Sequence, residues 1–200
     1  PGRVSSETGA PKRRRLWIGL ALLLTAAGTR TPMILVLPLW IGVRLARPQL
    51  LRATKHWPPA SVFIGLGTLF GLLTETFAIL DNLHKPPDAR ILVDPDVFRD
   101  LLFAAFYYAS FMTALYLLVR RIRFSPRDVF VIAGLDGILF EQMGAIAAGM
   151  VLNPLVGIPQ ALIVAVIYGT FPMLAHMLTV DRLPANRRPG SVRTTLWHSW

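Results

Sequence analysis

Cysteine is absent from the 200-residue chain, and charged residues are scarce. Without cysteine, the protein has no disulfide bond, no thiolate nucleophile and no cysteine ligand for a metal ion. Charged residues make up 16% of the sequence, whereas soluble domains carry about 25%. The mean hydropathy of +0.51 is far above the ordinary soluble range. Together these values exclude a soluble domain with a charged surface as the main part of the chain.

Long apolar runs dominate the sequence. Four of them reach the length of about 20 residues that crosses roughly 30 Å of hydrocarbon, and they lie at 60–80, 97–119, 129–152 and 154–178. They lack the polar face that a helix on the surface of a soluble protein would show. Two shorter runs precede them, at 16–28 and 33–46. The pattern predicts an all-α polytopic membrane protein with about six transmembrane helices, the first two of them short.

The basic residues segregate to one side of the predicted spans. Prominent runs lie at Lys12–Arg15, Arg120–Arg123 and Arg187–Arg188, and all Lys and Arg divide 17 to 4 between the two sides. Cytoplasmic loops are enriched in Lys and Arg, so both termini are expected in the cytoplasm and Asp81–Asp96 outside a cell (plasma) membrane. A nucleic-acid-binding surface is the alternative interpretation. The segregation favours the lipid bilayer instead, with anionic lipid head groups at the cytoplasmic face and no nucleic acid as partner.

The first apolar run also has the features of a signal peptide. Lys12–Arg15 would be its basic region, Leu16–Leu24 its apolar region and Thr25–Ala27 its cleavage site. The topology of the later spans is the same under this alternative, because the run at 33–46 would then enter from outside.

Five segments are expected along the chain. They are a basic cytoplasmic N-terminal segment (1–15), a short helical hairpin or two short spans (16–56), a first helical hairpin (57–123), a second helical hairpin (124–180) and a flexible cytoplasmic tail (181–200). The tail is expected to be flexible because it is polar and rich in Pro and Arg.

The two long hairpins resemble each other, which suggests an internal duplication. FGLLTETFAIL, from Phe70, aligns with DGILFEQMGAI, from Asp136, at an offset of 66; YASFMTALYLL aligns with YGTFPMLAHML at an offset of 60. The matched positions include Gly71 with Gly137, Glu75 with Glu141 and Tyr108 with Tyr168. The difference in offset falls in the outer loop, where length varies at low cost. Two such units in the same orientation would be related by an axis along the membrane normal.

Each matched glutamate lies among small residues on its helix. The small residues expected at close helix contacts are Gly67 and Gly71 in the first unit and Gly137 and Gly144 in the second. A charge at the centre of the bilayer costs roughly 2.5–3.5 kcal/mol on insertion scales, so each carboxyl needs a partner or a proton. Glu75 and Glu141 are therefore expected to face the interior of the bundle as proton-binding groups.

Further polar residues lie in the same spans. Counting 1.5 Å per residue places Tyr108 and Glu75 at similar depth, which predicts a Tyr–Glu hydrogen bond. The other candidates are Tyr168, Gln142 and Asp136, the last nearer the cytoplasm and on a different face from Glu141. Such a bond could equally lock the bundle without any transport role.

No metal or cofactor site is expected. Of the four histidines, only His176 lies in a predicted span, and it is roughly 12 Å from the level of Tyr168, too far to share a metal with Glu141. We expect His176 at the membrane interface instead.

Three classes of function remain. The first is a small proton- or cation-coupled transporter that uses the buried glutamates. The second is a structural or assembly subunit in which the acids stabilise helix packing. The third is a membrane-embedded enzyme, which is the weakest because the spans contain no nucleophile–base pair at one depth. The sequence leaves open a homo-oligomer or a larger membrane complex.

Overall fold

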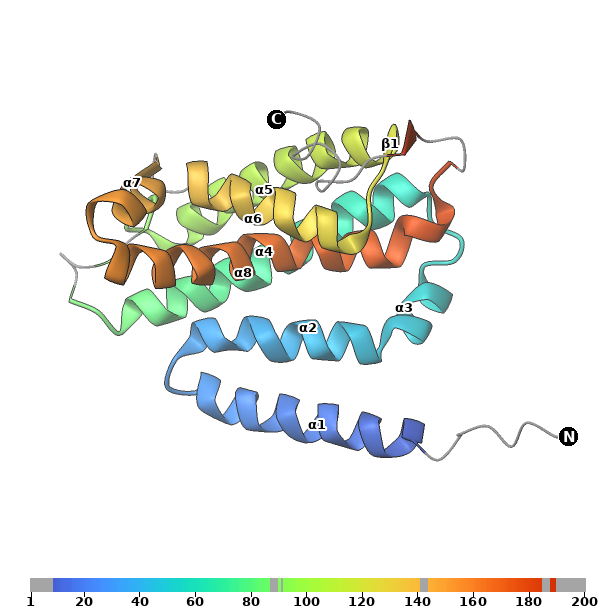
Figure 1. Cartoon of the computed structure of the whole chain (residues 1–200), viewed down its shortest axis with the longest axis horizontal. Helices are drawn as coiled ribbons and strands as arrows, with labels where there is room; N and C mark the ends of the chain where they lie inside the picture. The colour runs from blue at the N-terminus through green and yellow to red at the C-terminus, as the bar shows by residue number, and fades with distance from the viewer. Residues whose placement is uncertain (1–8, 87–89, 91, 141–143, 185–187, 190–200) are drawn as a thin grey trace, which may run out of the picture.

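The computed structural model describes residues 9–86, 90, 92–140, 144–184, 188 and 189, which form a bundle of helices (Figure 1). The helices are α1 (Gly9–Gly28), α2 (Val36–Leu45), α3 (Arg47–Ala53), α4 (Pro59–Leu83), α5 (Val97–Val119), α6 (Pro126–Phe140), α7 (Ala145–Leu152) and α8 (Pro154–Thr179). Two 3-10 turns, η1 (Pro32–Leu35) and η4 (Val180–Arg182), adjoin α2 and α8. The two-residue strands β1 (Ile122–Arg123) and β2 (Arg188–Pro189) pair in parallel.

Within these residues, three helical segments are long and apolar enough to cross a membrane: α4, α5 and α8 with η4. Two bent pairs raise the number to as many as five. They are η1–α2 with α3, bent by 67°, and α6 with α7, bent by 81°. The protein is therefore an all-α chain with three to five candidate membrane-spanning helices.

Proline and aspartate define the starts of the long helices. Pro59 is the first residue of α4 and Pro154 is the first residue of α8, a position where the missing N–H costs nothing. At the start of α5, the Asp96 carboxylate accepts hydrogen bonds from the backbone N–H groups of Phe98 and Arg99, at 2.9 and 3.1 Å. The two prolines and the Asp96 cap thus mark the positions at which α4, α8 and α5 begin.

The first helix of the second hairpin is not continuous over the apolar run at 129–152. Helix α6 ends at Phe140, and α7 begins at Ala145. Gly144 precedes α7 with φ +84°, a left-handed conformation that a right-handed helix does not contain and that glycine adopts without steric cost. Residues 141–143 lie outside the described residues. The prediction of a continuous helix here was wrong because an apolar run carries little information about such a break.

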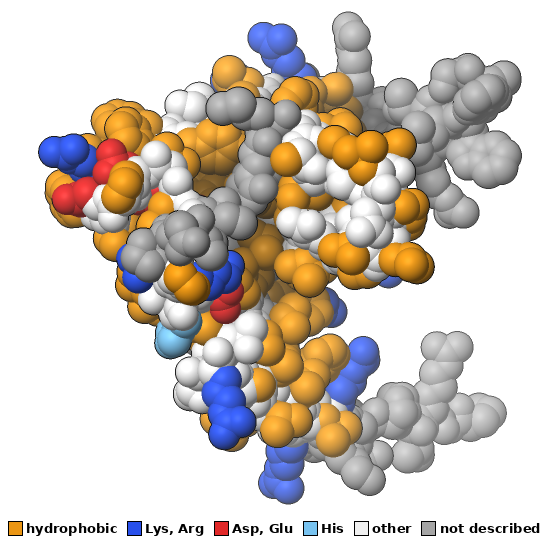
Figure 2. Space-filling view, turned by 90° about the vertical axis from the view of Figure 1, so that its left-hand side faces the viewer, with side chains coloured by type: hydrophobic (Ala, Val, Ile, Leu, Met, Phe, Trp, Pro, Cys, Tyr) orange, Lys and Arg blue, Asp and Glu red, His pale blue; other side chains and the backbone are white. Residues whose placement is uncertain are grey.

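Helix α8 is central in the bundle and contacts α6, α4, α7 and α2 (Figure 1). The core between α4, α5, α6 and α8 contains fully buried apolar side chains, among them Phe63, Met112, Val119, Val129 and Leu174. Many large apolar side chains are also exposed, and Figure 2 shows apolar side chains spread over one end of the molecule among other groups. An apolar exterior of this kind suits contact with lipid rather than with water.

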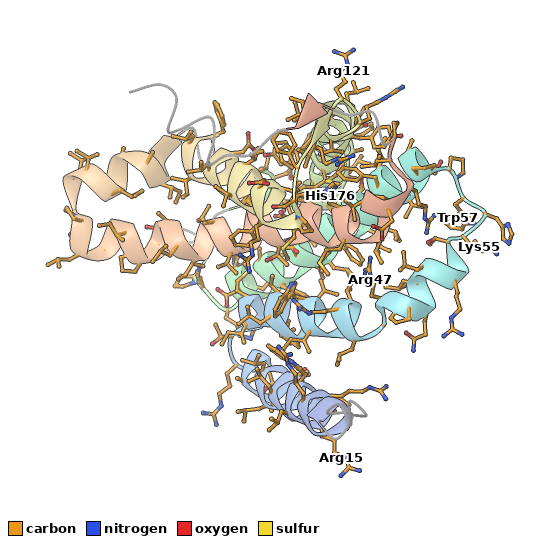
Figure 3. The ribbon with its side chains drawn as sticks, turned by 45° about the vertical axis from the view of Figure 1, so that its right-hand side comes forward. Arg15, Arg47, Lys55, Trp57, Arg121 and His176 are labelled. Atoms are coloured by element: carbon orange, nitrogen blue, oxygen red, sulfur yellow. The ribbon has the colours of Figure 1, made fainter. Side chains whose placement is uncertain are left out.

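Basic residues gather at one end of the bundle. Figure 3 shows Arg15, Arg47, Lys55 and Arg121 toward the end at which α1 and α4 begin and α5 and α8 end. Trp57 lies there too and is 56% exposed. All four of these basic residues belong to the seventeen counted on one side of the predicted spans.

The N-terminal helix and the residues just after α8 both contact the rest of the bundle. Helix α1 already begins at Gly9, ahead of the apolar run, and its Trp17 contacts Trp40 of α2 edge-on with centroids 6.0 Å apart. The tail was expected to be flexible from residue 181, but Leu183 is buried and Arg182 is hydrogen-bonded to Thr54. Most of the tail beyond Pro184 lies outside the described residues.

Candidate functional site

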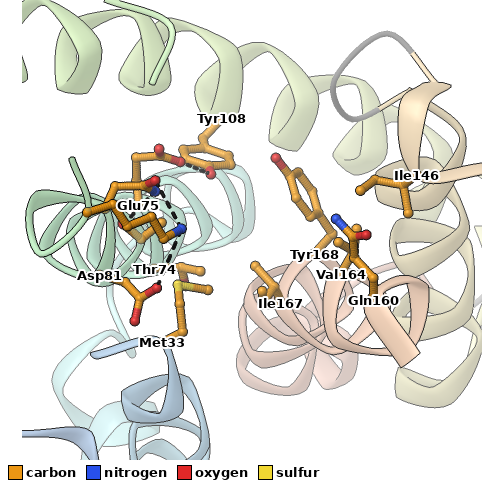
Figure 4. Close-up of a pocket in the computed structure, with 13 residues that line it drawn as sticks. Met33, Thr74, Glu75, Asp81, Tyr108, Ile146, Gln160, Val164, Ile167 and Tyr168 are labelled. Atoms are coloured by element: carbon orange, nitrogen blue, oxygen red, sulfur yellow. Dashed lines mark hydrogen bonds and ion pairs between the residues drawn. The ribbon is translucent and has the colours of Figure 1, made fainter. Parts of the chain in front are cut away.

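A cavity of about 190 Å³ lies between α4, α5 and α8, beside the last turns of α4. Helix α4 contributes Glu75, Asp81 and Asn82 to its lining, and Lys85 follows two residues after the helix ends. The facing helices contribute Tyr108 from α5 and Tyr168 and Gln160 from α8 (Figure 4). We refer to these seven residues and the space between them as the polar cavity.

Glu75 and Tyr108 form the inner part of the polar cavity. The Tyr108 hydroxyl donates a hydrogen bond to Oε2 of Glu75 at 2.7 Å, at the matched depth that the sequence predicted. Tyr108 is only 2% exposed. A hydrogen bond to a carboxylate is short and strong, so it holds Glu75 against α5.

Gly71 makes this contact possible. It lies one turn before Glu75 on α4, and a Cβ at this position would be 2.8 Å from Cγ of Tyr108. Real Cβ atoms do not come so close to a ring carbon, so any larger residue would displace the ring. Glycine therefore lets the two helices approach until the Tyr108 hydroxyl reaches the carboxylate.

The same arrangement occurs between α6 and α8. A Cβ on Gly137 would be 2.8 Å from Cδ2 of Tyr168, so the Tyr168 ring covers Gly137 as the Tyr108 ring covers Gly71. Phe171 lies between the two tyrosines, with ring centroids 5.0 Å from Tyr108 and 6.3 Å from Tyr168. The three aromatic rings thus pack against one another, and Figure 4 shows Tyr168 pointing from α8 toward Tyr108.

The mouth of the polar cavity carries a second polar group. Lys85 Nζ donates a hydrogen bond to Oδ1 of Asn82 at 3.2 Å and lies 4.0 Å from Oδ2 of Asp81. Asn82 in turn donates from Nδ2 to the backbone oxygen of Ala78 at 3.0 Å. None of these residues, nor Gln160, was among the sequence candidates. For Asp81, Asn82 and Lys85, the available signal was that they form a polar cluster directly after the apolar run at 60–80.

The remaining sequence candidates that the structure describes lie apart from the polar cavity. Glu141 and Gln142 lie outside the described residues. Asp136 is partly buried on α6, and it is not among the described residues that line the polar cavity. Gly67 contacts Met112 at a close helix crossing, whereas Gly144 lies at the break before α7, where it serves the backbone turn.

His176, which was expected at the membrane interface, is enclosed by protein in the last turn of α8. Its side chain is fully buried. Nε2 lies 3.0 Å from the backbone oxygen of Phe124, and the ring contacts Phe63 edge-on at 6.2 Å. The connection between α5 and α6 covers this end of α8, so the histidine is enclosed by protein. Within the described part of the chain, no group of three or more acidic or histidine side chains could hold a metal ion.

The arrangement offers one carboxylate inside a small space that has a polar mouth. Such a site can bind and release a proton or a cation, because the carboxylate is both accessible from the cavity and held by a donor. Comparison of the chain with protein-family models, with curated proteins and with solved structures finds no match.

Proposed function

We propose that the protein is a small transporter that couples movement of its substrate to a proton or cation through Glu75. The observation that supports this best is that the Glu75 carboxylate lines a cavity together with Asp81, Asn82 and Lys85, although it lies within an apolar span. A carboxyl used only for packing would be expected in a dry contact. One that must exchange a proton or ion needs an aqueous path.

The size of the polar cavity argues against an enzyme that acts on lipid or peptide chains. Pockets for drug-sized ligands have volumes of roughly 300–1,000 Å³, whereas this one has about 190 Å³. The described residues also contain no metal-binding group. A compact solute fits better than a chain molecule.

We also propose that the chain has six spans: two short ones, followed by two hairpins that arose by duplication. The support is the repeated packing of a glycine against a tyrosine, Gly71 with Tyr108 and Gly137 with Tyr168, at the offsets found in the sequence. In this proposal α7 takes the place of the outer loop of the first hairpin. Glu141 would be the second carboxyl of the transport pathway.

The proposed orientation has both termini in the cytoplasm of a cell whose plasma membrane holds the protein. The gathering of Arg15, Arg47, Lys55 and Arg121 at one end supports it, because cytoplasmic loops are enriched in such residues. The same residues are suited to bind anionic lipid head groups. The polar cavity would then open to the outside.

A structural or assembly subunit is the second candidate. It is favoured by the burial of Tyr108 and by its close contact with Gly71, which together make the Glu75 hydrogen bond part of a tight helix crossing. In that case the carboxyl would stabilise packing, and its protonation would have no further role.

Uptake into proteoliposomes tests the two candidates. Wild type, Glu75→Gln and the control Asp94→Asn, an acid in the outer loop away from the cavity lining, should be compared under an imposed pH gradient with sodium, potassium and small organic cations. The proposal expects uptake by wild type and the control, and loss of uptake with Glu75→Gln while the melting temperature is kept. No uptake of any substrate by a stable wild-type protein would favour the structural subunit.

A further inference from the structure

We propose that the Lys85 ammonium is a built-in counter-ion of the polar cavity, and that an alkali-metal cation binds there by displacing it. This inference concerns the charge selectivity of the same site and rests on the proposed transport function. It depends on which charged groups line the cavity, on how the Lys85 backbone is fixed, and on how weakly the Lys85 side chain is held.

The described lining of the cavity contains charged groups of both signs. Glu75 and Asp81 contribute carboxylates, and Lys85 is the one basic residue among the lining residues that the structure describes. An ammonium close to these carboxylates repels a soluble cation that the carboxylates attract. The position of the Lys85 side chain therefore controls how strongly the cavity attracts a cation.

The backbone of Lys85 is fixed by hydrogen bonds on both sides. Its N–H donates to the backbone oxygen of Asn82 at 2.9 Å, and its carbonyl oxygen accepts from Nε of Arg90 at 3.2 Å. Nη2 of Arg90 also donates to the backbone oxygen of Leu83, the last residue of α4, at 3.4 Å. The last carbonyl groups of a helix lack intrahelical partners. Arg90 thus satisfies the end of α4 and fixes the point from which the Lys85 side chain extends.

The side chain of Lys85 is held by weaker contacts. Nζ donates to Oδ1 of Asn82 at 3.2 Å and lies 4.0 Å from Oδ2 of Asp81 (Figure 4, dashed lines), and 40% of the Lys85 side chain is exposed. Asn82 is buried and donates to the backbone oxygen of Ala78, so its amide is fixed with Oδ1 toward Lys85. An ion pair this long and this exposed contributes little in water. Lysine also has a flexible four-carbon stem, so the ammonium is free to swing away while the backbone stays in place.

The oxygen atoms of the lining indicate the class of cation that replaces the ammonium. Glu75 and Asp81 offer carboxylate oxygens, and Asn82 offers an amide oxygen. Oxygen ligands are those that hard cations prefer. Multivalent hard cations such as calcium take six to eight oxygen ligands, several of them from carboxylates, and within the described residues no group of three or more acidic or histidine side chains could hold a metal ion. Two carboxylates with a neutral oxygen beside them suit a singly charged cation such as sodium or potassium.

Acetylation of lysine tests the displacement directly. The sequence contains only three lysines, Lys12, Lys55 and Lys85, so mass spectrometry can follow each of them in one sample of the full chain in lipid nanodiscs. Sodium or potassium chloride should be compared with N-methylglucamine chloride at the same ionic strength, with a water-soluble acetylating reagent. We expect either alkali-metal cation to accelerate acetylation of Lys85 by up to roughly fivefold, the factor that corresponds to loss of a pair of unit charges 4 Å apart in water. The exposed Lys55 is the internal control and should react at the same rate in all three solutions.

Two substitutions test the competition from the side of the protein. Asp81→Asn should make Lys85 react fast even without an alkali-metal cation, because the ammonium has lost its carboxylate. Lys85→Gln should strengthen equilibrium binding of radioactive sodium by roughly fivefold, because the competing charge is gone. Lys85→Arg, which keeps the charge, should bind sodium nearly as wild type. Lys55→Gln, at the basic end of the bundle, is the matched control and should have no effect.

The outcomes separate this inference from the transport proposal. Cation uptake that depends on Glu75, with acetylation of Lys85 unchanged by sodium and potassium, would overturn the counter-ion role and leave transport standing. Cation-dependent acetylation of Lys85 without uptake by wild type would support the site and overturn transport. Equal sodium affinity in Lys85→Gln and wild type would show that the ammonium does not compete with the cation and would overturn the inference.

Discussion

Arg182, in the turn η4 that follows α8, donates hydrogen bonds to Thr54, the C-cap residue of α3. Its Nη1 donates to the backbone oxygen of Thr54 at 2.7 Å, and its Nη2 donates to Oγ1 of the same residue at 2.8 Å. The last carbonyl groups of a helix lack intrahelical partners and carry partial negative charge, so a guanidinium is well placed there. Arg47 makes the reciprocal connection, from the start of α3 to Asp181 at 3.0 Å. This pair of arginines joins the bent helix α3 to the central helix α8.

Replacing Arg182 by lysine should destabilise the bundle. Lysine keeps the charge but cannot donate to both oxygens of Thr54 in the fixed geometry of a guanidinium. Hydrogen bonds from a charged group contribute roughly 1.5–3 kcal/mol, and partial exposure reduces this, so we expect a loss of about 1–2 kcal/mol. Thermal unfolding in detergent measures the effect, with the exposed Arg121→Lys as control. Equal melting temperatures for the two variants would contradict the role given to Arg182.

Gly71→Ala should be far more disruptive than Gly65→Ala, although both positions lie in α4. An alanine Cβ at 71 would collide with the Tyr108 ring, whereas no described atom lies within 4 Å of a Cβ built at 65. Overpacking costs roughly 1–3 kcal/mol, while alanine in place of glycine favours a helix by up to about 1 kcal/mol. We expect a lower free energy of unfolding for Gly71→Ala and an unchanged or higher one for Gly65→Ala. The same loss in both variants would argue against the close crossing.

The sequence predicted the helices of the first unit well but not the shape of the second. Uninterrupted apolar runs located α4, α5 and α8 to within a few residues, because length and hydropathy decide whether a segment suits a membrane. The break before α7 was missed, since Gly144 fits both a close helix contact and a turn with positive φ. The bend at Ala46, between α2 and α3, was missed for a similar reason: the apolar pattern ends there, but the backbone stays helical.

The inner half of the polar cavity was predictable and the mouth was not. Glu75 and Tyr108 could be paired from the sequence because helix rise gives depth. Asp81 and Lys85 were assigned to the loop, because they follow the apolar run. Helix α4 in fact continues to Leu83, so Asp81 lies on the helix and Lys85 directly after it, and both line the cavity. Gln160 gave no signal at all, because one amide in a long apolar helix looks like an isolated polar residue.

An epitope tag inserted after Pro86 should be accessible from outside intact cells. Pro86 follows α4 at the end of the bundle opposite the labelled basic residues, and positive charge marks the cytoplasmic side. A second tag after the exposed His56, at the basic end, should become accessible only after the cells are permeabilised. Antibody labelling of the two tagged proteins measures this. The reverse pattern would invert the orientation and place the mouth of the polar cavity in the cytoplasm.

Glu75 and Tyr108 should be energetically coupled, and a double-mutant cycle can measure the coupling. Tyr108→Phe leaves the carboxylate without this donor, so we expect it to lower the free energy of unfolding by roughly 1.5–3 kcal/mol. In the Glu75→Gln background the loss should be smaller, because a neutral amide oxygen accepts a weaker hydrogen bond. The expected interaction energy is roughly 0.5–3 kcal/mol. Tyr116→Phe, two turns further along α5, should give additive effects with Glu75→Gln and serves as the control. If the Tyr108 cycle were additive too, the 2.7 Å hydrogen bond would have no energetic role, and Glu75 would have to be held in the span by other groups.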